Sequence, residues 1–368
     1  MHSKVKKQKL YDALSKIQGV TDKNSVMPAL NHFLLDVSET NATVFATDLE
    51  TAIKLPVEAE IIGAGKICIP AKKFYEIIKG LDEDIELSLE KEYLKIKSGR
   101  TTFKIAVLNA SEFPEWPEIG EATQIVLHKN IFTNAINKTI YAVGEPDLRF
   151  TLNSLLFEIK NGEFHSVGTD GHRLAHFKTN INTSEDKKIL LSEKSLISLR
   201  KLLIDIDTET VSFYIGKGHV LFEIGEIKFL SRIVEGNFPD YDAILAIIKN
   251  NNKEAVVDRN SFINSLKRIS ILSKNRQNIV KIDWDKDKVV ISTSDPEFGE
   301  AQDEFDTTYN GELFIIGFNA KYLIDALSEI ESDKAKITMS EPDKAVYVIN
   351  NEPNGNYIYE SIVMPMRL

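Results

Sequence analysis

The sequence lacks several features that would place it in common classes of protein. It holds one cysteine, Cys68, in 368 residues, so no disulfide can form within the chain, as is typical of a reducing compartment. No run approaches the roughly 20 apolar residues that span a bilayer. The lysine-rich start, residues 1–10, has no apolar core behind it, so neither a signal peptide nor an anchor is expected. We therefore predict a cytoplasmic protein.

Two further scarcities concern glycine-rich loops and positive charge. The turn Gly63-Ala64-Gly65-Lys66 lacks the spacing of a phosphate-binding loop, so nucleotide hydrolysis is not expected. Lys and Arg total 45 against 55 Asp and Glu, which gives a net charge of −10 and disfavours simple adhesion to nucleic acid. The hydrophobic content of 43% is ample for packed cores, and the length predicts two or three domains.

The chain contains an internal repeat, visible in three independent markers. An apolar run, a capping residue, a spacer, a lysine and an amphipathic stretch recur with the lysines 122 and 127 residues apart, at Lys72, Lys194 and Lys321. A residue-proline pair recurs with steps of 125 and 126, at Phe113-Pro114, Phe238-Pro239 and Met364-Pro365. An aspartate ends an apolar run with steps of 122 and 125, at Asp48, Asp170 and Asp295. The repeat predicts three tandem domains, 1–121, 122–248 and 249–368.

Within each domain, the pattern runs twice through a helix followed by strands. Apolar residues at spacings of three and four predict first helices near 9–18, 130–141 and 261–272. Alternating segments such as 93–97 and 211–215 indicate half-buried strands. Ser192 and Asn319 stand where helix N-caps belong, Pro70 suits a first helical turn, and the polar run 249–253 indicates a linker. The expected fold is α+β, with two helices packed on antiparallel sheets in each domain.

The segment Gly168–Ala175 holds the densest group of reactive side chains. Asp170 and His172 could form an acid/base pair of a hydrolase, but no nucleophile is signalled beside them. His172 and His176 have the spacing of helical metal ligands, but no third ligand stands at a suitable distance. The alternative is a tight turn in which Asp170 caps amides and Gly171 takes a positive φ. We expect no catalytic residue, metal or cofactor.

The final residues, 362–368, are apolar almost to the end. They could form a last core strand, or their methionines could line a groove that adapts to several partner peptides.

Charge is unevenly distributed along the chain. The six segments that the repeat places as helices sum to +14, which leaves −24 for the remainder. Five of the six are positive, which indicates a common basic surface on an otherwise acidic protein.

Several motifs together resemble the bacterial DNA polymerase III beta subunit family, the sliding clamps. They are Gly168–Ala175, Arg149–Asn153, Ser231-Arg232 with Phe238–Tyr241, and Met364–Leu368. The resemblance covers the whole chain and implies a head-to-tail homodimer that closes into a ring of six similar domains. Helices would line the hole, through which duplex DNA passes, bound without regard to sequence. Polymerase III, the clamp loader, and other polymerases and repair factors would dock through short linear motifs.

The resemblance also implies site residues. The partner-peptide cleft falls on Leu152, Thr169, Gly171, His172, Arg173, Leu174, Pro239, Ile244, Asn319, Tyr322, Val363, Met364, Pro365, Met366 and Arg367. The dimer contact falls on Phe103, Ile105, Ile271 and Leu272. The basic residues expected to face DNA are Lys9, Lys16, Lys23, Lys72, Lys73, Lys79, Lys138, Arg149, Lys194, Arg200, Lys201, Lys267 and Arg268. Asp242, Ala243 and Ser154 depart from the family pattern and predict an altered charged rim of the cleft.

The first hypothesis is a processivity factor without chemistry of its own. A monomeric protein-interaction scaffold that uses the cleft without encircling DNA is the alternative from another class, and a hydrolase using Asp170 and His172 is the third.

Overall fold

The computed structural model describes residues 1–21, 26–144, 151–273, 278–352 and 355–368. Its α-helices in these ranges are α1 (Lys7–Ile17), α2 (Ala71–Lys79), α3 (Lys129–Ile140), α4 (Glu193–Asp205), α5 (Tyr241–Ile248), α6 (Arg259–Ser273) and α7 (Ala320–Ser328). The three predicted first helices are confirmed as α1, α3 and α6, each within two residues of its expected ends. Among the described residues, no helix combines the length and apolar character that a membrane crossing requires.

The chain divides into two compact units. Unit 1 holds Met1–Thr133 and Lys194–Ile233, and unit 2 holds Asn134–Glu193 and Val234–Leu368. Strands pair across the repeat boundaries inside each unit: β4 with β18 in unit 1, and β14 with β26 in unit 2.

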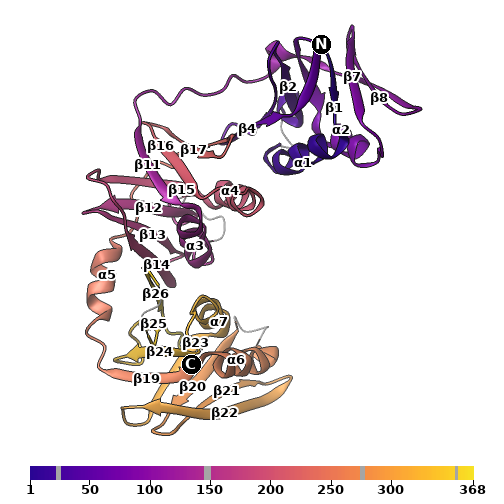
Figure 1. Cartoon of the computed structure of the whole chain (residues 1–368). Helices are drawn as coiled ribbons and strands as arrows, with labels where there is room; N and C mark the ends of the chain where they lie inside the picture. Colours follow the sequence, from indigo (N-terminus) through magenta and orange to yellow (C-terminus); the bar gives the residue numbers. More distant parts are fainter. Residues whose placement is uncertain (22–25, 145–150, 274–277, 353–354) are drawn as a thin grey trace. The chain divides into compact units, whose positions relative to one another are not determined.

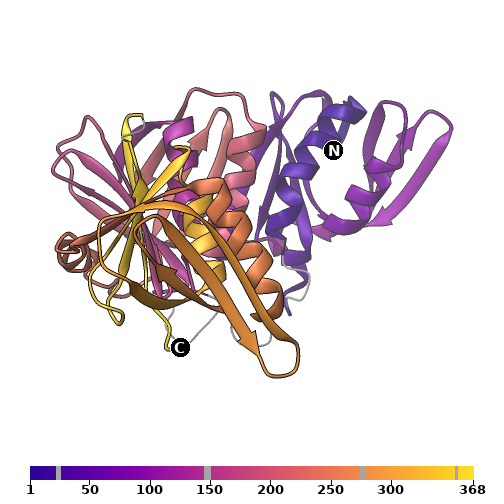
Figure 2. The same ribbon diagram turned by 90° about the horizontal axis from the view of Figure 1, so that it is seen from below.

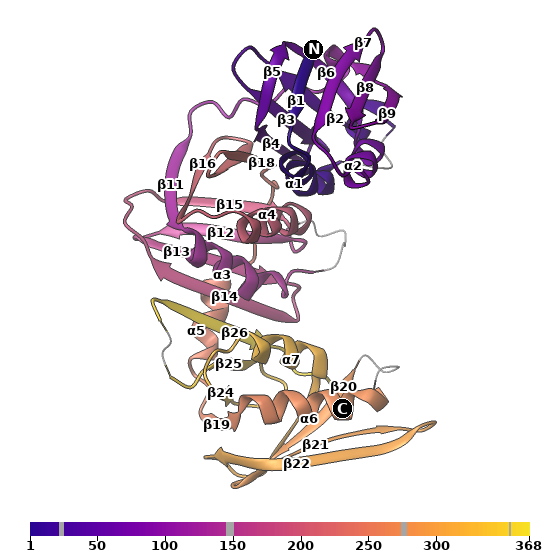
Figure 3. The ribbon, with the colours of Figure 1, turned by 45° about the vertical axis from the view of Figure 1, so that its right-hand side comes forward.

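Unit 1 contains two antiparallel sheets. The smaller has the order β5 (Ala59–Gly63), β1 (His2–Val5), β7 (Ile85–Glu90), β8 (Tyr93–Ser98) and β9 (Thr101–Ala106). The larger has the order β10 (Leu108–Asn109), β6 (Gly65–Pro70), β2 (His32–Val37), β3 (Ala42–Thr47), β4 (Thr51–Val57), β18 (Ile227–Arg232), β17 (His219–Ile224), β16 (Thr210–Ile215) and β11 (Thr123–His128). Helices α1 and α2 lie side by side (Figure 3). Despite its basic composition, β1 pairs along its length with both β5 and β7.

Unit 2 contains one twelve-stranded antiparallel sheet. Its order is β15 (Lys187–Ser192), β12 (Ser154–Lys160), β13 (Glu163–Thr169), β14 (Arg173–Asn180), β26 (Tyr357–Val363), β25 (Val346–Asn350), β24 (Lys334–Met339), β19 (Lys253–Asp258), β22 (Gly299–Tyr309), β21 (Lys288–Asp295), β20 (Ile279–Trp284) and β23 (Phe314–Asn319). Helices α6 and α7 lie side by side over the strands of the third repeat (Figures 2 and 3).

The core of the third repeat follows directly from the two periodicities of the sequence. Phe262, Leu266 and Ile269 recur along one face of α6 and are buried. Alternate residues of β20, such as Ile282 and Trp284, point at that helix face and are buried with it. The predicted cap Asn319 accepts a hydrogen bond from the Lys321 amide, while Pro70 and Ser192 directly precede α2 and α4. Element placement is therefore largely a local property of the chain.

Candidate partner-binding site

The hairpin between β13 and β14 is a tight turn held by its own side chains. The Asp170 carboxylate accepts hydrogen bonds from the amides of His172 (2.8 Å) and Arg173 (2.9 Å). The Thr169 hydroxyl donates to the Arg173 carbonyl (2.7 Å), and Gly171 has a φ of 88°. This confirms the tight turn that the sequence left open. The two amides occupy Oδ1 of Asp170 and the Arg173 guanidinium donates to Oδ2, so neither oxygen is free for an acid/base pair.

The C-terminal tail joins this turn to another strand. Because β14 pairs with β26, Arg173 lies opposite Val363. Beyond β26, the Met364 amide donates to the His172 carbonyl (2.8 Å), and the Met366 amide donates to the Gly317 carbonyl of β23 (2.8 Å). The tail thus connects the second repeat to the third within unit 2, and together the turn and the tail form what we call the turn–tail surface, Gly168–Leu174 with Met364–Leu368.

Burial separates the predicted cleft residues into two groups. Gly171, His172, Met364 and Arg367 are exposed, with Met364 39% exposed. Six are half-buried: Pro239, Ile244, Asn319, Tyr322, Pro365 and Met366. Five are buried: Leu152, Thr169, Arg173, Leu174 and Val363.

The buried group changes how the apolar part of the surface is built. Val363 has no exposed area, so it supports the surface from beneath rather than presenting a side chain to a ligand. Leu174 is buried in a cluster against which Ile244 packs. Whereas Leu174 and Val363 are buried, Ile244 and Met364 remain accessible as apolar side chains of the predicted cleft.

Arg173 is the centre of a polar cluster beneath the surface. Its guanidinium lies 3.0 Å from a carboxylate oxygen of Asp170 and 2.5 Å from one of Asp325 on α7. It also lies over the rings of Tyr322 (4.6 Å) and Tyr141 (5.3 Å). At 8% exposure, it holds the turn and α7 together. Arg173 is thus a positioning residue for the surface.

Helix α5 is an element that the sequence analysis missed. It lies on the side of β13 and β14 opposite to α3 (Figure 1) and buries Tyr241 and Leu245 against those strands. Its signal was present in the sequence, because Asp240 is an N-cap residue that accepts a hydrogen bond from the Ala243 amide (3.1 Å).

Asp242, one of the residues that depart from the family pattern, forms an ion pair within the chain. Lys160 on β12 lies 2.5 Å from the Asp242 carboxylate and 3.1 Å from that of Glu158. Its ammonium also lies 4.6 Å from the centre of the Tyr241 ring. Burial alone would lower the pKa of Lys160, but the hydrogen bonds to Asp242 and Glu158 and the charges of these two carboxylates together outweigh burial and raise it. The acidic residue therefore belongs to a local network that fastens α5 to the sheet.

Two buried histidines lie beneath α5. His165 and His176 stack with ring centres 5.3 Å apart and share a hydrogen bond of 3.0 Å, while His176 bonds Glu360 (2.8 Å). Burial and the neighbouring His176 lower the pKa of His165 to about 4. His176 therefore belongs to this buried network, while His172 stands in the exposed turn. Among the described residues, no group of three or more His, Cys, Asp or Glu side chains is arranged so that it could hold a metal ion.

The basic residues expected to face DNA fall into distinct groups. Lys72, Lys73 and Lys79 are exposed on α2, as are Lys201 on α4 and Lys267 on α6. Lys73 pairs with Glu76, and three others pair with acidic residues while remaining accessible: Lys9, Lys194 and Arg268 pair with Glu58, Asp48 and Asp303. Lys16 and Arg200 are half-buried. Lys23 and Arg149 lie outside the described residues.

Lys138 was wrongly predicted to face DNA, because its side chain is buried. It is 4% exposed, bonds the Glu331 carboxylate and the Glu329 carbonyl (both 2.8 Å), and lies over the rings of Tyr357 and Tyr359. A cation so enclosed cannot meet a phosphate. Within the observed bounds of the six helices that the repeat predicts (α1–α4, α6 and α7), the net charge is +10, which leaves −20 for the rest of the chain. The separation of charge is therefore smaller than the expected +14 and −24, but it has the same sign.

The residues expected at a subunit contact are apolar and accessible. Phe103 (37% exposed) and Ile105 lie on β9, an edge strand of its sheet. Ile271 (65% exposed) and Leu272 lie at the end of α6. Exposed apolar side chains at an edge strand are typical of a surface that pairs with another chain.

Comparison with known proteins covers the whole chain. Sequence models of the N-terminal, central and C-terminal domains of the DNA polymerase III beta subunit match residues 1–117, 126–240 and 246–367. A beta sliding clamp of Pseudomonas aeruginosa is 30% identical over 100% of both chains. The crystal structure of the DNA polymerase III beta subunit of that organism aligns with a TM-score of 0.94, at 30% identity over 100% of both chains. The corresponding structure from Thermotoga maritima aligns with a TM-score of 0.92, at 28% identity over 100% of this chain and 99% of the other.

Proposed function

The chain belongs to the DNA polymerase III beta subunit family, and we propose how its own residues do the work of a sliding clamp. A sliding clamp is a ring-shaped homodimer that encircles duplex DNA and tethers the replicative polymerase to it. It acts by topology, so it needs phosphate contacts strong enough to orient DNA and weak enough to let it slide. In this chain, the three repeats would form the domains 1–121, 122–248 and 249–368, and we propose that the protein acts in the cytoplasm.

The turn–tail surface, with Pro239, Ile244, Asn319 and Tyr322, is the proposed cleft for partner peptides. The observation that carries this proposal is the pair of backbone hydrogen bonds from Met364 and Met366, which hold the tail between two repeats. Met364 is flexible and polarisable and stands exposed beside His172, so apolar and polar contacts are available to one ligand.

Peptide binding tests this assignment. A peptide that contains the clamp-binding motif of the organism's own polymerase III catalytic subunit should bind with micromolar or better affinity in calorimetry. Met364→Lys should weaken binding at least tenfold, because the lysine places a charge where an apolar anchor docks. Ile358→Lys is the matched control, since Ile358 is also apolar and exposed (49%) but lies on β26 away from the tail. Equal affinity of Met364→Lys and the wild type would refute the assignment.

The proposed DNA-facing surface comprises the exposed lysines of α2, α4 and α6. After loading, the protein should stay on a closed circular duplex and leave when the circle is cut, because a ring slides off an end. Replacing Lys72, Lys73 and Lys79 by glutamate should shorten residence and reduce its salt dependence. Equal loss from closed and linear DNA would contradict encirclement.

Closure of the ring is proposed to use Phe103 and Ile105 of one subunit against Ile271 and Leu272 of the other. The measurement is the mass in solution, which should be that of a dimer at micromolar concentration and fall to a monomer in Phe103→Asp with Ile271→Asp. A wild-type monomer would instead support the scaffold that binds partners without encircling DNA. We propose no chemical step, because the Asp170 carboxylate already accepts two amide hydrogen bonds and pairs with Arg173.

A further inference from the structure

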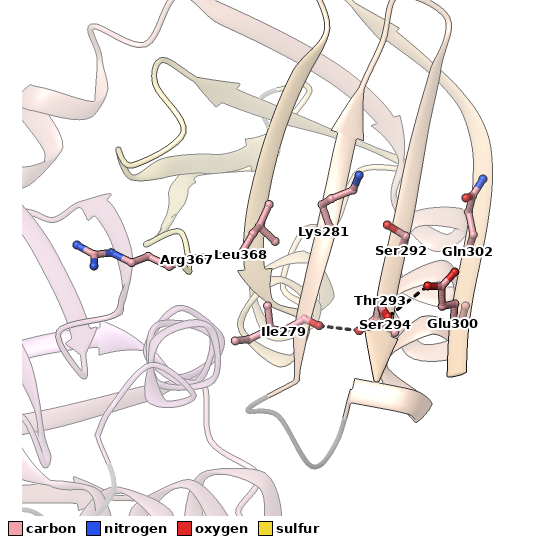
Figure 4. A pocket seen from close by; sticks show the side chains of 10 residues that line it. Ile279, Lys281, Ser292, Thr293, Ser294, Glu300, Gln302, Arg367 and Leu368 are labelled. Atoms are coloured by element: carbon pink, nitrogen blue, oxygen red, sulfur yellow. Dashed lines mark hydrogen bonds between the residues drawn. The ribbon is translucent and has the colours of Figure 1, made fainter. Parts of the chain in front are cut away.

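A groove of about 590 Å³ lies on strands β20, β21 and β22, next to the C-terminal tail (Figure 4). Its lining includes Lys281, Ser292, Ser294, Glu300 and Gln302. These side chains alternate with the buried residues that face α6, so the groove lies on the opposite face of the sheet. Ile279 and Leu368 supply its apolar part.

Strand register identifies the same place in the other two repeats. In each repeat, the first strand after the first helix (β2, β12 or β20) pairs with the strand that leads into the second helix, at His32↔Pro70, Ser154↔Ser192 and Ile279↔Asn319. Two residues further along β2, β12 and β20, the pairs with the next strand in the chain are Leu34↔Phe45, Leu156↔Val167 and Lys281↔Ser292. Two residues further along that strand, the next hairpin pairs Thr47↔Ala52, Thr169↔Leu174 and Ser294↔Glu300, which adds Ala52, Leu174 and Glu300 to this face. The apolar trio of repeats one and two is thus Lys, Ser and Glu in repeat three.

A segment of the chain covers this place in the first two repeats. In the first, Phe113 and Trp116 lie 5.0 and 5.3 Å from the ring centre of Phe45. In the second, Phe238 and Tyr241 are buried in one cluster with Leu156, Val167 and Leu174. In both repeats, the covering segment begins at the recurrent residue-proline pair, Phe113-Pro114 or Phe238-Pro239, and packs on this face of the sheet.

In the third repeat, the corresponding segment covers only one side of this face. The tail begins at the third residue-proline pair, Met364-Pro365, and contacts β23 through the Met366 amide. The Leu368 side chain packs against Gly317, 2.7 Å from the position that a Cβ on this glycine would take. Arg367 and Leu368 then form one margin of the groove, while Lys281, Ser292 and Glu300 remain uncovered within it.

We propose that this groove holds the flank of the partner peptide whose anchor occupies the cleft, an inference that rests on the proposed function. The tail forms part of both sites, so an extended peptide passes from one to the other along Met366–Leu368. Because a polar trio replaces an apolar one, the flank is hydrophilic, with a single aliphatic residue against Ile279 and Leu368. An acidic group in the flank would share Lys281 with Asp283, now 2.8 Å from its ammonium, and a basic group would meet Glu300.

Two peptides from the organism's polymerase III catalytic subunit test the proposal. The short peptide contains the clamp-binding motif alone, and the long one adds ten residues on each side. The long peptide should bind the wild type at least tenfold more tightly, which corresponds to about 1.4 kcal/mol. Ser292→Trp fills the groove and should abolish this gain while leaving the short peptide's affinity unchanged. Ser292→Ala is the matched control and should keep the gain.

A second measurement does not depend on how Ser292→Trp folds. In the wild type, the long peptide should slow amide hydrogen exchange in β20–β22, and the short peptide should not. Equal affinity of the two peptides, or a gain that survives both Ser292→Trp and Lys281→Glu, would overturn the groove proposal alone. Failure of both peptides to bind the wild type would overturn the cleft assignment, and the groove proposal with it.

Discussion

Replacing Arg173 by methionine should lower the free energy of unfolding by about 3 kcal/mol and weaken peptide binding, although the side chain is almost inaccessible to a peptide. Methionine fills a similar volume but removes the charge that Asp170 and Asp325 share. Breaking a buried ion pair by removing one partner costs about 3–5 kcal/mol. The two carboxylates keep 14% and 25% of their exposure, so water can reach them and the low end of that range applies.

The cation–π contacts add to this cost. The guanidinium lies over Tyr322 and Tyr141, and each such contact is worth about 0.5–1 kcal/mol when partly exposed and more when buried. Methionine keeps part of this packing through its own contact with the rings. Because Tyr322 belongs to the proposed cleft, its displacement should weaken peptide binding about tenfold without any lost contact between Arg173 and the ligand.

Urea denaturation at a fixed protomer concentration measures the change, and calorimetry measures the affinity. Arg367→Met is the matched control, because Arg367 is exposed in the same tail and should lose affinity with less than about 0.5 kcal/mol of stability. A double-mutant cycle with Asp325→Asn should give a coupling above about 1 kcal/mol. A loss below about 1 kcal/mol for Arg173→Met, equal to that of the control, would refute the reasoning.

Three further outcomes follow from the structure. The pKa of His165 is lowered to about 4, below the roughly 6.5 of an unfolded chain, so between these values the unfolded state binds an extra proton. The free energy of unfolding from urea titrations should therefore fall as pH drops from 6.5 to 4, by at most about 3 kcal/mol, and His165→Asn should flatten that slope. Gly168→Ala should lower the free energy of unfolding by about 1–3 kcal/mol, because the added Cβ would lie 2.3 Å from the Thr139 carbonyl oxygen of α3. The control Ala301→Gly, at a half-buried position, should lower it by less than about 1 kcal/mol in the same assay. Lys160→Met should loosen α5 and raise its amide exchange, and adding Asp242→Asn should restore part of the loss; an unchanged exchange rate would contradict the role of this pair.

Local patterns in the sequence determined the number of repeats, the first helix of each repeat and the turn at Gly171. These are properties of neighbouring residues, because helical spacing, alternation and a positive φ each act over a few positions. The recurrent lysine, proline and aspartate markers needed only comparison of the chain with itself. The residues at the expected subunit contact came from the family resemblance, and their role stays a prediction.

Tertiary structure decided which of these side chains are available and which are enclosed. Lys138 and Arg173 look in sequence like other basic residues, but Glu331 and Asp325 reach them from more than 150 positions away and remove them from the surface. Helix α5 forms over a sheet whose strands come from two repeats, and that apolar surface exists only after the strands have paired. The polar groove of the third repeat is likewise invisible until register aligns Lys281 with Leu34 and Leu156. Burial is a sum over distant partners, so only the folded chain defines it.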